Sequence, residues 1–173
     1  MTCFDLKSAY HHISIDKRDW KYLGFSIILE GKEMFFTFVV LPFGFYDSIC
    51  VLTKVMRHVL TGWRQGNIMS FIHIDDGIIA SKEEEEARKV SERVQKDLRD
   101  FGLILSPDKC IWKPTRKLTW TGIEWDTELF LCRIPEKKML KAERKIQSIL
   151  SRKQKVPVKD LASVCGLHLQ NKV

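Results

Sequence analysis

The segment SFIHIDDGIIAS (70–81) places two adjacent acids, Asp75 and Asp76, in the middle of an apolar run. Its pattern predicts a hairpin of two short buried strands with the turn at Asp-Asp-Gly. Turn chemistry explains Asp before Gly, but it does not explain why two like charges stand side by side between apolar arms. A cation between the carboxylates would hold such a pair together. A plain turn and a metal site are therefore both open on this segment alone.

The segment TCFDLKSAY (2–10) has the same feature on a smaller scale, because Asp5 ends a short apolar strand. If that strand lies beside the hairpin, three carboxylates converge at one edge of a sheet. A set of oxygen ligands selects Mg²⁺ or Mn²⁺ over zinc. Two such ions about 4 Å apart serve in-line phosphoryl transfer. The residues thus predict a metal-dependent enzyme that acts on phosphates.

Composition indicates a globular protein of one domain, or one domain with a small appendage. The chain has 173 residues, of which 45% are hydrophobic and 29% charged. Its apolar runs are too short to span a membrane, and its first residues lack the pattern of a signal peptide. Five cysteines without a Cys-x-x-Cys pair indicate a reducing compartment and neither a disulfide framework nor a zinc site. We expect an intracellular protein, in the cytoplasm or the nucleus.

The net charge of +7 lies in one segment. Residues 133–155 contain nine Lys or Arg and two acids, which leaves 20 basic and 20 acidic residues elsewhere. A basic helix predicted from about residue 136 to 150 suggests a polyanionic partner, of which nucleic acid is the usual one. A solvated helix face is the alternative.

The predicted elements alternate too irregularly for a parallel sheet and include too many helices for an all-β fold. The elements predict an α+β fold, in which helices pack on one face of an antiparallel sheet. A small helical lobe follows, with a boundary near Pro135. The predicted strands lie near 2–6, at both sides of a turn at 30–32, around the Asp75–Asp76 hairpin, within 101–125 and at 129–135. Four helices are predicted. The first starts at a cap formed by Asp47 or Ser48, and the second covers 82–101 with an inward face that includes Phe101. The third covers 136–150, with Met139, Ala142, Ile146 and Ile149 buried, and the fourth begins near Pro157.

Five segments together resemble a known family. They are DLKSAY (5–10), LPFG (41–44), IDD (74–76), GLxxxPDK (102–109) and WTG (120–122). In this order they are similar to palm motifs A to E of reverse transcriptases, the RNA-directed DNA polymerases, and most similar to those of DIRS-like retrotransposons. The resemblance implies a palm over 1–134 and part of a thumb or connection over 135–173.

The resemblance also implies roles at a nucleotidyl-transfer centre. Asp5, Asp75 and Asp76 would be the catalytic acids that hold two Mg²⁺ (or Mn²⁺) ions. Tyr10 would lie under the sugar of the incoming dNTP and exclude a 2′-hydroxyl, although a core aromatic is the alternative. Phe43 and Gly44 would contact the nucleotide. The alternative is a structural loop that joins a hairpin to a helix, because the same residues suit such a loop.

Further roles follow for the triphosphate, the primer and the duplex. Lys109 would reach the triphosphate. Trp120, Thr121 and Gly122 would form the primer grip, although the tryptophan also suits a core. The implied partners are an RNA template, a DNA primer and a dNTP. The basic helix would contact phosphates of the duplex without reading sequence, through Lys137, Lys138, Lys141, Arg144 and Lys145.

The match departs from the family at three points. His73 stands where Tyr or Phe is usual, and Ser48-Ile49 replaces a common Ala-Pro. The chain also begins four residues before Asp5, so the fingers that normally precede motif A are missing, which suggests a fragment or a truncated gene model. A catalytically inactive, truncated or repurposed palm remnant that at most binds nucleic acid is therefore the alternative. A nucleotide cyclase is disfavoured, because it needs no primer grip.

Overall fold

The computed structural model describes residues 1–151 and 156–162. The chain divides into two compact units, Met1–Thr115 and Arg116–Val173, and each is described by itself. The strands that follow residue 116 pair with one another and not with the first sheet. The boundary between palm and thumb near Pro135 stays a prediction. The predicted α+β class is confirmed.

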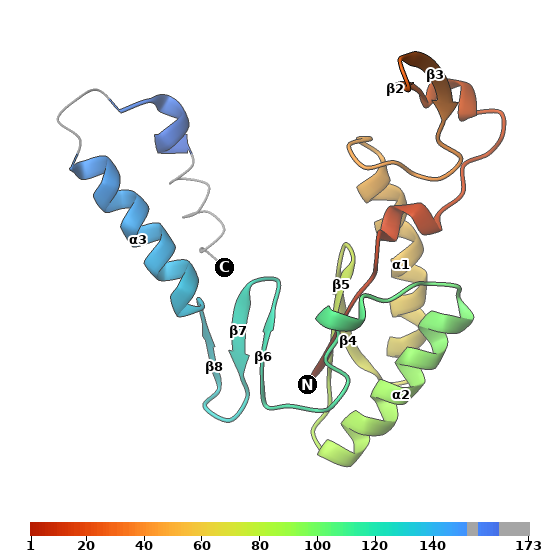
Figure 1. Cartoon of the computed structure of the whole chain (residues 1–173). Helices are drawn as coiled ribbons and strands as arrows, with labels where there is room; N and C mark the ends of the chain where they lie inside the picture. Colours follow the sequence, from red (N-terminus) through yellow and green to blue (C-terminus); the bar gives the residue numbers. More distant parts are fainter. Residues whose placement is uncertain (152–155, 163–173) are drawn as a thin grey trace. The chain divides into compact units, whose positions relative to one another are not determined.

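Three antiparallel strands form the sheet of the first unit, in the order β1 (Thr2–Asp5), β5 (Asp76–Ala80) and β4 (Met69–His73). Figure 1 shows the three strands side by side. The predicted hairpin is confirmed, but its turn lies one residue earlier than expected, at Ile74 and Asp75.

Gly77 is therefore a buried strand residue and not part of the turn. The reason is steric, since the sheet register puts Gly77 opposite Phe4. A Cβ atom on Gly77 would lie 2.1 Å from the Phe4 ring, so only glycine leaves room for that ring.

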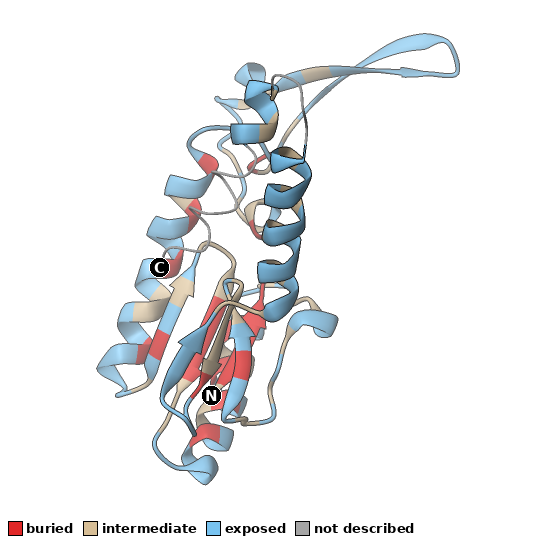
Figure 2. Cartoon of the chain, turned by 90° about the vertical axis from the view of Figure 1, so that its left-hand side faces the viewer, coloured by how far each residue is buried: buried red, intermediate tan, exposed pale blue. Residues whose placement is uncertain are grey.

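Two helices, α1 (Ser48–Gln65) and α2 (Glu84–Asp100), cover the face of the sheet that carries Phe4. Buried residues, red in Figure 2, lie on the strands and at intervals along the helices. They form one core, which buries apolar area and so stabilises the unit. Its members are Phe4, Leu6, Ala9, Leu52, Met56, Trp63, Ile79, Val94 and Leu98.

The helix ends differ in detail from the sequence prediction. Asp47 occupies the N-cap position of α1, but its side chain makes no capping hydrogen bond. The Ser48 hydroxyl instead donates to the carbonyl oxygen of Pro42 over 2.8 Å. The prediction that Phe101 faces inward is wrong, since α2 ends at Asp100 and Phe101 at the C-cap is 59% exposed.

A second hairpin projects from the first unit, formed by β2 (Gly24–Leu29) and β3 (Lys32–Thr37) (Figure 1). It pairs with no other strand among the described residues. Two short 3₁₀ helices, η1 (Ala9–His12) and η2 (Trp20–Tyr22), precede it. The predicted turn at 30–32 is confirmed, but these strands form a sheet of their own.

The second unit begins with an antiparallel sheet of β6 (Lys117–Trp120), β7 (Ile123–Asp126) and β8 (Leu131–Arg133). Helix α3 (Glu136–Leu150) follows, with the predicted bounds. The predicted buried stripe of α3 is wrong, because no residue of the helix is buried and Met139 and Ile146 are exposed. No described segment of this unit covers that side of α3.

A helical turn at 158–162 follows Pro157, and the rest of that predicted helix lies outside the described residues. Cys165 also lies outside them, and the four described cysteines are free thiols. Among the helices that the structure describes, none is both long and apolar enough to cross a membrane.

Candidate active site

The last residue of β1, Asp5, lies directly opposite the first residue of β5, Asp76. Their carboxyl groups are joined by a hydrogen bond. Asp75 lies in the adjoining two-residue turn, whose position is fixed by the hydrogen bond from the Leu6 amide to the Asp75 carbonyl oxygen, at 3.0 Å. The structure thus brings the three predicted acids to one end of the sheet.

The turn that carries Asp75 holds a strained residue. Ile74 has φ of 58°, in the left-handed region that β-branched side chains rarely adopt. Such a conformation costs on the order of 1–3 kcal/mol and persists where the surroundings impose it. Here the paired strands on both sides of the turn impose it, and the strained turn holds Asp75 beside Asp76.

The electrostatics of the two paired carboxyls differ. Burial, the hydrogen bond to Asp5 and the charge of Asp75 raise the pKa of Asp76 to about 6. For Asp5, burial by itself raises the pKa. Hydrogen bonds with Ser106, Lys109 and Asp76 outweigh burial, so the pKa of Asp5 is lowered from its ordinary value. The pair therefore holds one proton, on Asp76, below about pH 6, and loses it as the pH rises through that value.

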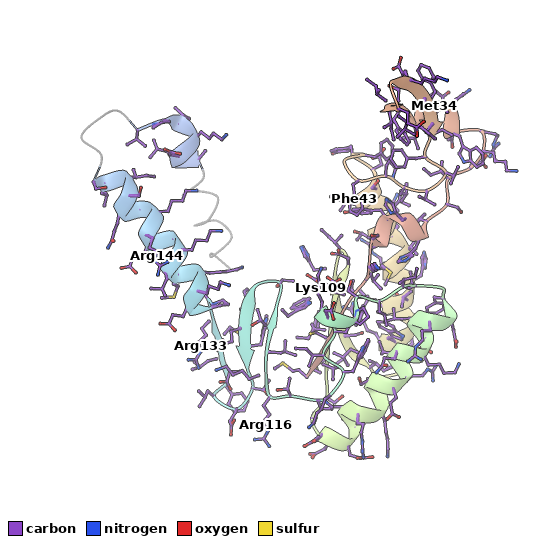
Figure 3. All side chains as sticks on the ribbon, viewed as in Figure 1. Met34, Phe43, Lys109, Arg116, Arg133 and Arg144 are labelled. Carbon is purple, nitrogen blue, oxygen red and sulfur yellow. The ribbon has the colours of Figure 1, made fainter. Side chains whose placement is uncertain are left out.

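Lys109, labelled in Figure 3, lies at the end of the short helix η3 (Pro107–Lys109). Its Nζ donates to Oδ2 of Asp5 over 3.0 Å. The hydrogen bond and the negative charge of Asp5 raise the pKa of Lys109, so its ammonium is the counter-ion of Asp5. The predicted contact of Lys109 with a triphosphate stays a prediction.

The donor atoms at this end of the sheet fit a hard divalent cation in chemical type, because all are carboxylate oxygens. In the present arrangement the Lys109 ammonium compensates the charge of Asp5, and below about pH 6 a proton neutralises Asp76. Accordingly, within residues 1–151 and 156–162 no three His, Cys, Asp or Glu side chains are grouped as metal ligands.

The motif A and motif B residues Tyr10 and Phe43 pack edge to face, with ring centroids 5.2 Å apart. His11 packs against the other rim of the same phenyl ring, at 5.1 Å. Phe43 remains 61% exposed, and a Cβ atom on Gly44, with φ of 82°, would meet nothing within 4 Å. The structure thus joins motifs A and B in an open aromatic cluster.

Two features of this cluster bear on the sequence predictions. Tyr10 also packs against the core, and its role as a sugar gate stays a prediction. His11 is not among the site residues predicted from the sequence, although its place directly after Tyr10 is a signal for a second ring against Phe43. His73 is exposed and lies opposite Asp76 in the β4–β5 pairing, on the same face of the sheet.

In the second unit, Thr121 and Gly122 form the two-residue turn between β6 and β7. Both have positive φ, 49° and 78°, as hairpin turns of this length require. The Lys138 Nζ lies 2.0 Å from the point where a Cβ of Gly122 would be, so the ammonium rests on this turn. The Trp120 and Trp125 rings lie 6.3 Å apart, and their buried indole N–H groups have no hydrogen-bond partner among the residues that the structure describes.

Helix α3 carries the predicted basic residues on its surface. Lys137, Lys141 and Arg144 recur at helical spacing and, with Leu140, line a shallow depression. Figure 3 shows Arg144 on this helix, with long side chains standing off the ribbon. The structure therefore places a positively charged stripe along α3, which also carries Lys145.

A family model described as "Reverse transcriptase (RNA-dependent DNA polymerase)" matches residues 1–125. The chain belongs to the reverse transcriptase family. The match spans the three acids, the aromatic cluster, Lys109 and the β6–β7 turn. Recognition from the five sequence motifs is therefore confirmed, whereas the DIRS-like lineage stays a prediction.

Several relatives of this reverse transcriptase chain are polyproteins of retroelements. It is 31% identical over 108 residues to the retrovirus-related Pol polyprotein from transposon gypsy of Drosophila melanogaster, a match that covers 62% of this chain and 10% of the polyprotein. It is 28% identical over 120 residues to the Gag-Pro-Pol polyprotein of bovine leukemia virus, covering 65% of this chain and 8% of that one. The chain thus spans about a tenth of the length of these relatives.

Solved structures share the fold. The foamy viral protease-reverse transcriptase in complex with dsDNA matches with a TM-score of 0.74 and 21% identity, over 97% of this chain and 32% of that one. The same viral protein in complex with an RNA/DNA hybrid matches with a TM-score of 0.73 and 22% identity, over 96% and 20% of the two chains. At this identity the likeness shows a common fold.

Proposed function

We propose that this chain carries the nucleotidyl-transfer centre of an RNA-directed DNA polymerase of a retroelement, which adds dNTPs to a primer 3′-hydroxyl inside the cell, in the cytoplasm or the nucleus. One observation carries the proposal. In a chain of the reverse transcriptase family, the register of β1 and β5 sets Asp5 against Asp76, and a strained turn holds Asp75 beside them. Three acids that repel one another converge where a polymerase of this family needs divalent cations.

The acids would act as ligands. The carboxylates of Asp5, Asp75 and Asp76 would hold two Mg²⁺ or Mn²⁺ ions, which supply Lewis acidity for attack by the primer hydroxyl and for departure of pyrophosphate. The burial of Asp5 gives it a fixed position in the β1–β5 ladder. A fixed carboxylate keeps the reacting groups in line, which is the main contribution of a protein to phosphoryl transfer.

The aromatic cluster would select the nucleotide. Tyr10 is held from two sides, by the core and by the edge of Phe43, so its ring cannot easily move aside for a 2′-hydroxyl. The exposed face of Phe43 and the open backbone at Gly44 would receive the sugar and the base.

The second unit would hold the nucleic acid. Foamy viral proteins of this fold form complexes with dsDNA and with an RNA/DNA hybrid, which supports an RNA template and a DNA primer as partners here. The β6–β7 turn, with Trp120, Thr121 and Gly122, would position the primer. The basic stripe on α3 would contact phosphates, because a Lys/Arg stripe is attracted to a polyanion irrespective of its sequence.

One observation favours a second candidate, a palm remnant without catalytic activity that binds nucleic acid at most. Among the described residues the acids are compensated by a proton and by Lys109 and are not grouped as metal ligands. A remnant would keep this arrangement even when divalent cations are supplied.

Primer extension separates the two candidates. The purified chain is given an RNA template, a DNA primer, dNTPs and Mg²⁺ or Mn²⁺, in parallel with Asp75→Asn and with Asp19→Asn, a control of equal charge change at an exposed site on η2. We expect extension by the unmodified chain and by Asp19→Asn and none by Asp75→Asn. Extension that survives in Asp75→Asn would contradict the proposed centre, and no extension by any folded chain would favour the remnant.

A further inference from the structure

The ion pair between Lys109 and Asp5 joins two residues of very different freedom. The Asp5 side chain is 9% exposed and the Lys109 side chain is 68% exposed. Asp5 is fixed in the β1–β5 ladder. The Lys109 ammonium, by contrast, stands at the end of a flexible four-carbon side chain that is largely exposed to solvent. The ammonium can therefore leave without movement of the carboxylate.

The backbone around the pair is anchored independently of it. The Ser106 amide donates to the Asp5 carbonyl oxygen over 2.8 Å, and the Lys109 amide donates to the Ser106 carbonyl oxygen over 3.1 Å. The Asp5 amide also donates to Sγ of Cys110 over 3.4 Å. These bonds hold η3 against β1 whether or not the Lys109 side chain touches Asp5, so breaking the ion pair does not unfold the site.

The charges at this end of the sheet are unbalanced. Three acids meet there, and Lys109 is the basic side chain that interacts with all three, through a hydrogen bond to Asp5 and through the charges of Asp75 and Asp76. A monovalent ammonium at 3.0 Å occupies an oxygen that a divalent cation would use. A divalent ion has twice the charge, and carboxylate oxygens are its preferred ligands, so it displaces the ammonium at sufficient concentration.

We propose that Lys109 is an exchangeable counter-ion of Asp5, which competes with the divalent cation for the carboxylate and is released when the cation binds. The inference rests on the proposed function in one respect only, that the competing cation is Mg²⁺ or Mn²⁺. Exchange would couple two steps, since the ammonium becomes free to contact an incoming polyphosphate once the metal is in place. Without metal, the ion pair would keep the buried carboxylate neutralised.

Cation affinity tests the exchange without any catalytic step. Binding of Mn²⁺ to the full chain is followed by electron paramagnetic resonance, with no nucleotide or nucleic acid present, in the unmodified chain, Lys109→Met and Lys109→Arg. Lys113→Met is the matched control, because Lys113 is an exposed lysine on the same segment. We expect Lys109→Met to bind Mn²⁺ about three- to tenfold more tightly than the unmodified chain, since no ammonium has to be displaced. Lys109→Arg and Lys113→Met should stay close to the unmodified chain.

A second measurement uses the unmodified chain alone. The side-chain ¹³Cε and ¹⁵Nζ signals of Lys109 should move on addition of Mg²⁺ to the values of a solvated lysine. Equal Mn²⁺ affinity in the unmodified chain and Lys109→Met, equal tightening by Lys113→Met, no Mn²⁺ binding by any chain, or Lys109 signals that ignore Mg²⁺ would each overturn the exchange. Because none of these readouts requires primer extension, a failure of polymerase activity is recognised separately.

Discussion

Asp5 and Asp76 face each other across the β1–β5 pair, with their carboxyls joined by a hydrogen bond, although they are 71 positions apart in the sequence. The sheet register creates this contact, and the strained turn at Ile74 adds Asp75 to it. Charging two carboxylates in such contact costs free energy, and this raises the pKa of Asp76.

The first prediction concerns the pH dependence of the metal-free protein. Burial, Asp5 and Asp75 raise the pKa of Asp76 from 3.8 to about 6, so the folded state keeps a proton that the unfolded state has lost. The contribution of Asp76 to stability is therefore full below about pH 4 and is lost as the pH rises to about 6. Carboxyl ¹³C NMR in the presence of a chelator measures this pKa, and Asp5→Asn should lower it. An Asp76 that titrates near 4 in the metal-free chain would contradict the carboxyl pair.

The second prediction concerns selection of the sugar. Tyr10→Val removes the ring that Phe43 and the core hold in place, so incorporation of rNTPs relative to dNTPs should rise on the order of 10- to 100-fold. The ratio of kcat/KM for rNTP and dNTP measures this change. Tyr22→Val is the control, because Tyr22 is 73% exposed and has no contact with Phe43. An unchanged ratio in Tyr10→Val would assign Tyr10 to the core alone.

The third prediction concerns the packing of Gly77. A methyl group at this position would overlap the Phe4 ring, so Gly77→Ala should lower the free energy of unfolding by about 1–3 kcal/mol or more. Gly62→Ala is the matched control, since Gly62 lies in α1 with nothing within 4 Å of its added Cβ. That change should raise the free energy of unfolding by about 0.5–1 kcal/mol. Urea denaturation measures both, and equal stability of the two variants would refute the steric account.

The fourth prediction concerns the basic stripe on α3. Changing Lys137, Lys141 and Arg144 together to Ala should weaken duplex binding and reduce the slope of log K against log salt by about 2 to 3, because about 0.9 counterion is released per phosphate contact. A triple change on α2, at Arg88, Arg93 and Lys96, removes the same charge from residues that pair with acids on their own helix. Fluorescence anisotropy at several salt concentrations compares the two. Equal slopes for both triple variants would mean that net charge alone binds the duplex.

Much of this fold could be predicted because local patterns are strong in this chain. Two apolar arms around a polar turn located β4 and β5, and helical spacing located α3 to its observed bounds. Recognition of the acids required the order of five motifs as well, since Asp75 and Asp76 alone also suit a turn.

Other features depend on contacts that sequence patterns do not contain. The Lys109–Asp5 ion pair joins positions 104 apart, and its partner choice follows from how η3 docks on β1. Gly77 looked like a turn residue because its conflict with Phe4 exists only in the paired strands. The exposed stripe of α3 shows that helical spacing predicts an apolar face but not what covers it.

The most direct test of the central claim asks where divalent cations bind. Amide NMR signals of the chain are followed while Mn²⁺ is added well below stoichiometry, so that only residues close to a bound ion lose intensity. The account predicts selective loss at Asp5, in the turn of Ile74 and Asp75, and at Asp76, with recovery in Asp5→Asn. Uniform loss over the surface, or loss centred elsewhere in the chain, would contradict a metal centre at this end of the sheet.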